Sequence, residues 1–371
     1  MGERRDGEAE PVTWALAIAG IAMLIVIHEA GHAIAAKLCG MRVERFALFF
    51  PPLLLKRQIG ETEYAIGALP LGGYVRIAGQ TPDDVLPPGE EHRSYANRPV
   101  WQRAVVIAAG PAANIVAALV IIAAILMLDG VTKVTPEVAP AALSAPAAGA
   151  LEPGDRIVAV DGVKGGPEVL VRQTRTHSCP GPGKPQPGCL AARPAVLTVE
   201  RDGRTRTISL YPRWDESVGA MRLGFAFDQA KETLGPLAAA SRSVELGWRV
   251  SVDTVKGFSA IGSQKGREQL SGIVGVSVVT EQAFSRDLLN ALQLLALISL
   301  LIAIVNLFPI LPLDGGHLFW LAVEKLRGRP ASQETLGRAT AVGLALVAVL
   351  FVIGLSNDIG RLGGSGFPGG P

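Results

Sequence analysis

Four long apolar segments divide the chain, and more polar sequence separates each from the next. These segments are 12–36, 100–128, 288–308 and 336–355. A transmembrane α-helix needs about 20 predominantly apolar residues, so each segment is long enough to cross a bilayer. One such segment alone could be a buried core helix. Four of them in 371 residues predict a polytopic α-helical membrane protein.

The composition supports this prediction. Hydrophobic residues make up 49% of the chain and charged residues 18%, which is less charge than soluble domains usually carry. The net charge of +2 gives no broad electrostatic attraction to nucleic acid, so we expect a lipid bilayer and no nucleic-acid partner. The first apolar segment follows a polar tail, 1–11, and lacks a small-residue cleavage site. We therefore interpret it as a retained span and not as a signal peptide.

Basic residues orient the spans, because Lys and Arg concentrate in cytoplasmic loops. They gather between the first and second spans and again before the fourth. These residues are Lys37, Arg42, Arg45, Lys56, Arg57, Arg76, Arg93, Arg98, Arg103, Lys325, Arg327, Arg329 and Arg338. The rule places segments 37–99 and 309–335 on the cytoplasmic side. The N-terminus, the long middle region and the C-terminus then face outward.

The connecting segments carry weaker signals. Thr62–Ala78 alternates aromatic and β-branched residues with Gly and Pro, which is typical of a short β-hairpin. This hairpin follows the apolar stretch Phe46–Leu55 and would lie against the membrane surface. The connector 214–287 contains Leu234–Ile261, with apolar residues at helical spacing between charges. That pattern fits both an amphipathic helix on the membrane surface and an ordinary connector helix. The Gly- and Pro-rich tail, 356–371, is predicted to be disordered.

An inserted α+β domain is predicted at 131–213, between the second and third spans. Its strand candidates are RIVAVDG, AVLTVERDG and RTRTISLYP, and a helix candidate lies at Glu168–Thr176. The run SAPAAGALEPGDRIVAVDG at Ser144–Gly162 resembles the core signature of a PDZ domain, which binds peptides by adding a strand to a sheet edge. A generic β-rich domain without a peptide groove is the alternative.

An HExxH motif, His28-Glu29-Ala30-Gly31-His32, lies within the first apolar segment. Residues four apart share one helix face, so both imidazoles can bind one zinc ion. Glu29 is then placed to move a proton from water to the leaving amine. An ionisable side chain in a spanning helix costs about 2.5–3.5 kcal/mol. A bound divalent metal ion would offset this cost.

A hydrolytic zinc site usually has three protein ligands, and the end of the third span offers the candidates. Asp314 and His317 both lie in the run NLFPILPLDGGH, whose prolines break the helix and whose glycines permit close backbone approach. Irregular backbone at membrane depth is tolerated where it lines a polar cavity. We favour Asp314 as the third ligand, with His317 adjacent.

These motifs together resemble the site-2 protease family of intramembrane zinc metalloproteases. HEAGH in the first span, NLFPILPLDGGH at the third and a PDZ-like segment between the second and third spans match its bacterial branch. That branch cleaves membrane-anchored anti-sigma factors and signal-peptide remnants. Gly72-Gly73-Tyr74-Val75 matches its membrane-associated β-hairpin, and Gly110-Pro111-Ala112-Ala113-Asn114 matches its second-span motif.

The resemblance implies roles for matching positions. His28, His32 and Asp314 would bind Zn²⁺, with Glu29 as general base. Residues of the third-span and hairpin motifs would contact substrate, and Asn114 would either contact substrate or hold the core helices together. The implied substrate contacts are Asn306, Pro309, Pro312, Asn114, Gly72, Gly73 and Tyr74.

The resemblance also implies a setting. Substrates would be transmembrane proteins trimmed beforehand by another protease. The enzyme would lie in the bacterial inner membrane, with its active site toward the cytoplasm and its PDZ-like domain outside. Cys179 and Cys189 flank a Pro- and Gly-rich loop in that outward domain, where an oxidising compartment would permit a disulfide.

Three departures from the family pattern stand out; none removes a ligand, and the last two concern substrate gating more than catalysis. Leu311 stands where the family commonly has proline, and the proline here is Pro312. Ser271–Gly275 lacks the proline of a Ser-Gly-Pro motif, and one PDZ-like module is evident where some relatives have two. Two other functions stay open from the residues. One is a membrane-anchored zinc protease of exposed loops in quality control, and the other is a non-catalytic PDZ membrane scaffold.

Overall fold

The computed structural model describes residues 11–80, 84, 88–140, 143–181, 183–260, 263, 280, 283–285 and 287–362. The chain divides into two compact units. The first comprises 1–127 and 235–371, and the second comprises 128–234. The predicted N-terminal tail, 1–11, lies outside the described residues except for Pro11. The Ser271–Gly275 departure lies wholly outside them.

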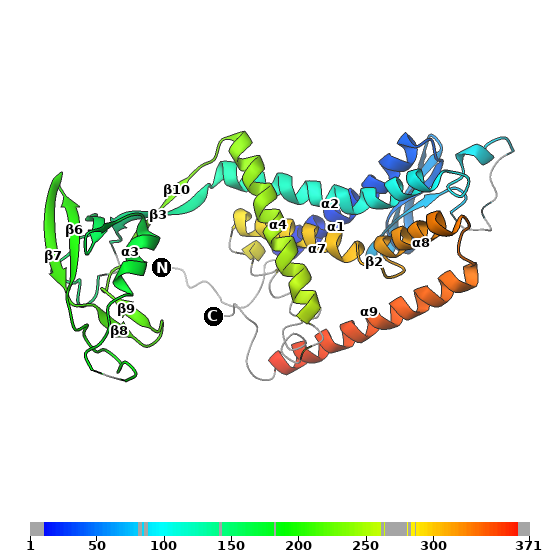
Figure 1. Cartoon of the computed structure of the whole chain (residues 1–371). Helices are drawn as coiled ribbons and strands as arrows, with labels where there is room; N and C mark the ends of the chain where they lie inside the picture. The colour runs from blue at the N-terminus through cyan, green and yellow to red at the C-terminus, as the bar shows by residue number, and fades with distance from the viewer. Residues whose placement is uncertain are drawn as a thin grey trace. The chain divides into compact units, whose positions relative to one another are not determined.

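The first unit contains the apolar helices (Figure 1). They are α1 (Pro11–Leu38), α2 (Val100–Leu128), α7 (Leu288–Asn306) and α9 (Gln333–Leu362). Among the described residues, four helices are long and apolar enough to cross a membrane, and at most 28% of each apolar window is buried within the protein. Helices whose apolar side chains stay exposed require an apolar solvent, so a multi-pass membrane protein is the architecture that these helices fit.

The first unit also holds the less apolar helices α4 (Pro236–Ala260) and α8 (Asp314–Arg327) and the 3₁₀ turn η1 (Glu91–Arg93). Helix α8 occupies a region that the sequence predicted as a loop, 309–335. Likewise, α9 continues to Leu362, beyond the predicted span end at 355 and into the predicted tail. Residues 363–371 lie outside the described part of the chain.

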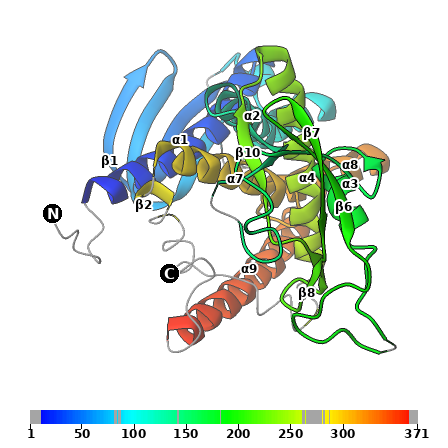
Figure 2. The same cartoon turned by 90° about the vertical axis from the view of Figure 1, so that its left-hand side faces the viewer.

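The hairpin differs from its prediction. Thr62–Ala78 is not a complete hairpin, because it forms essentially one strand, β2 (Thr62–Ile77), which pairs with β1 (Val43–Ile59) beside α1 (Figure 2). The apolar stretch Phe46–Leu55 belongs to β1. The turn falls at Gly60, whose φ of +62° suits glycine. The paired region is therefore about twice as long as predicted.

Both hairpin strands bend, so each of them contributes two paired segments to the sheet. Arg45–Leu48 pairs with Glu63–Ile66 and also with Gly73–Arg76, while Leu55–Ile59 pairs with Thr62–Ile66. The order across the sheet is consequently 55–59, 62–66, 45–48 and 73–76. Gly73–Arg76 lies at one edge of this described sheet.

The second unit is β-rich. Its strands are β3 (Val131–Val138), β4 (Arg156–Val160), β5 (Val163–Lys164), β6 (Ala195–Arg201), β7 (Arg204–Leu210), β8 (Arg213–Asp215), β9 (Ala220–Arg222) and β10 (Phe227–Glu232). The main sheet has the order β10-β3-β4-β6-β7, and α3 (Pro167–Thr174) packs against it. The predicted end at 213 is too early, because β10 pairs with β3.

One apolar core holds the second unit together. Its buried members are Val138, Ala147, Leu151, Ile157, Val160, Leu170, Ala195, Leu197, Val199, Leu210 and Leu223. Alternate residues of β6 point into this core, as expected of a strand with one buried face. Outside it, a disulfide joins Cys179 to Cys189, whose Cα atoms are 6.1 Å apart.

Candidate metal centre

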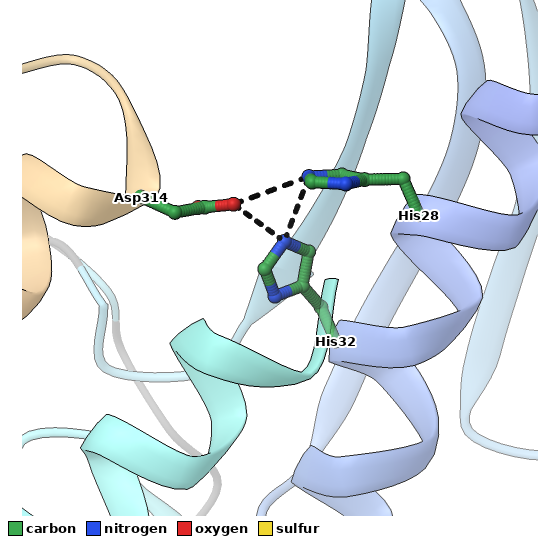
Figure 3. Close-up of side chains that lie close together, drawn as sticks. All are labelled: His28, His32 and Asp314. Carbon is green, nitrogen blue, oxygen red and sulfur yellow. Dashed lines mark hydrogen bonds and ion pairs between the residues drawn. The ribbon is translucent and has the colours of Figure 1, made fainter. Parts of the chain in front are cut away.

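Two imidazoles and a carboxylate converge within the first unit (Figure 3). His28 Nε2 lies 3.3 Å from His32 Nε2, and Asp314 Oδ2 lies 3.2 Å from the first and 3.4 Å from the second. The two histidines are each 8% exposed. Within the described part of the chain, this is the one group of three metal-ligating side chains whose donor atoms all lie within 4.8 Å of one another.

Local sequence explains this convergence. The i,i+4 spacing places both histidines on one face of α1. Asp314 is the first residue of α8, directly after the turn that follows α7. Gly315 and Gly316 sit so close to the backbone of 307–311 that a Cβ on either would come within 3.0 Å of it. Glycine at both positions therefore lets α8 begin where Asp314 faces α1.

A backbone carbonyl orients His32. Its Nδ1 lies 2.8 Å from the carbonyl oxygen of Val106 in α2, so Nδ1 carries the proton and the lone pair of Nε2 faces Asp314. The two helices approach closely here, since a Cβ on Gly31 would come within 3.0 Å of Ala109 and Ala113. Helix α2 thus fixes the ring of one candidate ligand.

The donor set fits a zinc ion. Asp314 Oδ2 is buried and has no hydrogen-bond partner within the described residues, although two imidazole nitrogens are close to it. A buried carboxylate oxygen left in this state is costly, and a cation between the three atoms would satisfy it. Two imidazoles with one carboxylate are also a common ligand set of hydrolytic zinc sites.

A cavity of about 650 Å³ contains this cluster. Its lining residues come from α1, the hairpin, α2, α7 and α8. They are Ile21, Ile25, His28, Glu29, His32, Phe50, Gly72, Gly73, Tyr74, Val75, Ile77, Gln80, Val106, Ile107, Ile302, Asn306, Pro312, Leu313, Asp314 and His317. Glu29 faces the same cavity as the histidine–aspartate cluster, so the metal-ligating and proton-transferring groups share one chamber.

Most residues predicted to contact substrate also line the cavity. Five of them do so, namely Gly72, Gly73, Tyr74, Asn306 and Pro312. Pro309 and Asn114 are not among the lining residues. Asn114 is fully buried, and its carbonyl oxygen accepts a hydrogen bond of 2.8 Å from the Ser299 hydroxyl. This contact joins α2 to α7 through the Asn114 backbone, so both roles of the Asn114 side chain stay predictions.

His317 lies one turn after Asp314 on α8 and faces the cavity, outside the three-atom cluster. Burial lowers the pKa of His317, against the opposing charge of Asp314. The structure brings Asp314, and not His317, to the two imidazoles, and its role as third ligand stays a prediction.

Sequence reasoning did not identify several residues around the site. Val106 acts through its carbonyl oxygen, a group that every residue carries, so no residue type signals it. Tyr95 packs against the buried cluster of α1, β1 and α2 residues, and burial raises its pKa to about 12. The Arg103–Glu324 ion pair joins positions 221 residues apart. Such separation gives no local pattern.

Spanning helices around a buried His–His–Asp cluster are the features of a membrane metallohydrolase. Comparison with known proteins agrees. The model of the family described as Peptidase family M50 matches residues 16–350. This chain therefore belongs to peptidase family M50, the site-2 protease family, and is a zinc metalloprotease.

Individual relatives are similar over nearly their whole length. A protein of Synechocystis sp. named "Putative zinc metalloprotease" is 34% identical over 358 residues, covering 92% of this chain and 93% of its own. A protein of the same name from Rhizobium meliloti is 30% identical, covering 93% and 95%. Regulator of sigma-E protease RseP of Salmonella typhimurium is 29% identical, covering 95% and 99%.

Proposed function

We propose that this enzyme hydrolyses peptide bonds inside or beside transmembrane segments of other membrane proteins. The observation that carries the proposal is the position of the cavity among candidate spans. Ile25 of α1, Ile107 of α2 and Ile302 of α7 line it together with the metal cluster. A protease of exposed loops needs its site on a soluble domain, whereas this site opens between apolar helices.

His28, His32 and Asp314 would hold the zinc ion in this proposal. Bound zinc supplies a Lewis acid that polarises the scissile carbonyl group and stabilises the negative charge of the transition state. Val106 keeps the His32 ring in its binding orientation. The Glu29 carboxylate takes a proton from the attacking water and delivers it to the leaving amine nitrogen.

The substrate would bind as an extended strand. A helical peptide bond is protected by its own hydrogen bonds, so the substrate must unwind before hydrolysis. Gly73–Arg76 is an edge segment of the hairpin sheet, and Gly73, Tyr74 and Val75 line the cavity. The backbone of this edge segment can therefore pair with an unwound substrate segment. Asn306 and Pro312 line the same cavity.

The β-rich unit would act as a PDZ-like filter. Its strand β10 lies at the edge of the main sheet, which is where strand addition takes place, and α3 packs on the same sheet against β3 and β4. By the positive-inside rule, this unit lies outside the bacterial inner membrane and the catalytic cavity opens toward the cytoplasm. The filter would admit substrates already trimmed by another protease. The similarity to a regulator of sigma-E protease favours anti-sigma factors or signal-peptide remnants as substrates.

The proposed reaction is tested with a reporter that carries one transmembrane segment, reconstituted with purified enzyme in vesicles. Wild type should cut within or next to that segment, and mass spectrometry locates the cut. Glu29→Gln should retain zinc and lose activity by a factor of about 10²–10⁴. Glu334→Gln, at an exposed position of α9, is the matched control. Cuts confined to loops outside the membrane would support the quality-control alternative, and no metal-dependent cut would overturn the proposal.

The filter has a separate test. Glu232 pairs with Val131, so the two chain ends of the β-rich unit are adjacent and a short linker can replace 131–232. The shortened enzyme should cut untrimmed reporters that the full chain rejects. Unchanged selectivity would refute the filter and leave the proposed catalytic chemistry intact.

A further inference from the structure

An ion pair joins α8 to α2 at a point away from the candidate metal centre. Arg103 lies near the start of α2, and Glu324 lies near the end of α8. The Arg103 Nη2 atom donates to Glu324 Oε1 at 2.5 Å, and Nη1 donates to Oε2 at 3.1 Å. The two side chains are only 12% and 16% exposed. This two-point geometry fixes orientation as well as distance.

The Arg103 side chain is itself held in place. Its Nε donates to the carbonyl oxygen of Arg98 at 3.0 Å, and its guanidinium carbon lies 5.9 Å from the centre of the Tyr95 ring. The Tyr95 backbone N–H donates to the carbonyl oxygen of Ala78, at the end of the hairpin, at 2.8 Å. Arg103 is therefore a fixed point to which α8 can be attached.

This fixed point lies one helical turn from the carbonyl that orients His32. Val106 follows Arg103 by three residues in α2. On the other helix, Asp314 precedes Glu324 by ten residues, which is about 15 Å along α8. The same turns of α2 thus hold the ring of one candidate ligand and the helix that carries another.

The start of α8 packs closely against the backbone of 307–311 at Gly315 and Gly316. Within the described part of the chain, Arg103–Glu324 is the one ion pair that α8 makes apart from those of Asp314. Without it, α8 could turn about its own axis. A small rotation of this kind would swing the Asp314 carboxylate away from the two imidazoles.

We propose that Arg103 and Glu324 are positioning residues, forming a clamp that sets the distance of Asp314 from His28 and His32 and thereby the zinc affinity. This inference rests on the proposed ligand set. Neither residue lines the catalytic cavity, so neither contacts substrate there.

The test measures zinc affinity of the full-length enzyme in detergent by competition with a chromophoric chelator. Glu324→Gln keeps the shape of the side chain but removes its charge. Loss of a group that supports metal ligands typically weakens binding 10- to 100-fold, and we expect about tenfold here because the support acts through a helix. Glu334→Gln removes an exposed partner of Arg338 and should leave affinity unchanged. Equal affinity in Glu324→Gln and wild type overturns the clamp.

A double-mutant cycle separates positioning from general loosening of the fold. In an Asp314→Ala background the helix has no ligand to position, so Glu324→Gln should cause no further loss of zinc affinity. An equal loss in both backgrounds overturns the clamp. Asp314→Ala alone tests the ligand set: if its affinity equals that of wild type, the proposed site fails and not merely the clamp.

If Glu324→Gln fails to fold correctly, a more conservative substitution, Glu324→Asp, tests the clamp. Glu324→Asp keeps the charge but shortens the side chain by one methylene, so at most one of the two hydrogen bonds can persist. Its zinc affinity should fall between those of wild type and Glu324→Gln, with thermal unfolding close to that of wild type. Wild-type affinity in Glu324→Asp, with a correctly folded protein, also counts against the clamp.

Discussion

Gly110 of α2 lies directly against the imidazole of His32. A Cβ at position 110 would come within 3.0 Å of three His32 ring atoms, including the Nε2 that faces Asp314. Cβ atoms in protein structures do not come this close to non-bonded atoms. Gly110 lies in α2 and His32 in α1, so both backbones are held in helices. The ring would have to move, and its 2.8 Å hydrogen bond to Val106 would be distorted.

Gly110→Ala should therefore weaken zinc binding. A displaced ligand typically costs about 10- to 100-fold in metal affinity or activity, and both should fall together. Gly337→Ala in α9 is a matched control, because nothing lies within 4 Å of its added Cβ. Zinc content by elemental mass spectrometry and reporter cleavage are the measurements. Full zinc content in Gly110→Ala would show that the ring has room.

The metal site was accessible from sequence because its chemistry is local. The histidines of HEAGH need only helical periodicity to meet, and an apolar setting makes their polarity conspicuous. Asp314 was reached by elimination among polar residues near span ends. The structure places these three together, as the sequence indicated, although they come from the two ends of the first unit.

The structure that supports the site was harder to predict from the sequence, since it depends on tertiary contacts. Gly315, Gly316 and the preceding prolines have the composition of a loop, yet the glycines begin a helix because only they allow such close packing. Pro51 and Pro52 suggest a break before the hairpin, but the bent strand β1 continues through them. Pairing of β10 with β3 spans the whole inserted unit, so no local pattern could extend its boundary past 213.

Asp155 gives the β-rich unit a specific acid sensitivity. Its buried carboxylate accepts two hydrogen bonds of 2.6 Å from Arg201 and one of 2.8 Å from the Glu152 N–H. Burial alone would raise the pKa of Asp155, but these bonds and the Arg201 charge outweigh it and hold the pKa below its ordinary value. The resulting stability is fully present above the unfolded pKa of about 3.9 and is lost as pH falls through the folded pKa.

Asp155→Asn should lower the free energy of unfolding by about 3 kcal/mol at pH 7, since Arg201 loses its buried partner. The difference from wild type should shrink toward pH 3. Oxidation of Met221, which is 2% exposed in β9, reports unfolding of this unit along a urea series in the full chain. Asp202→Asn, at an exposed turn, is the control. A difference independent of pH would contradict the assignment.

The disulfide should stabilise the same unit. Cys179 and Cys189 close a short loop, and the loop end is docked because Trp214 N–H donates to the Cys189 carbonyl oxygen at 2.8 Å. In the chain-entropy model, a loop of this length contributes about 3 kcal/mol. Replacing both cysteines by Ser should lower the urea midpoint of Met221 oxidation, whereas Cys39→Ser should not. Alkylation without reductant that labels all three cysteines would show that the bond is absent.

Gly73 offers a test of Glu29 that is independent of the metal ligands. A Cβ at position 73 would lie 2.8 Å from Glu29 Cγ, 3.0 Å from the Ala47 carbonyl oxygen and 3.1 Å from Ile25 Cγ2. Because the Ala47 backbone is fixed in the sheet, the Glu29 side chain must shift. Gly73→Ala should then reduce kcat about 10²-fold, within the range that a positioned acid–base group supplies. Zinc content should stay at the wild-type level, in contrast to Gly110→Ala.

Gly257→Ala in α4, where nothing lies within 4 Å of the added Cβ, should match wild type in both respects. A Gly73→Ala enzyme with wild-type kcat and raised KM would assign Gly73 to substrate pairing alone, and one that loses zinc would place its effect on the ligands.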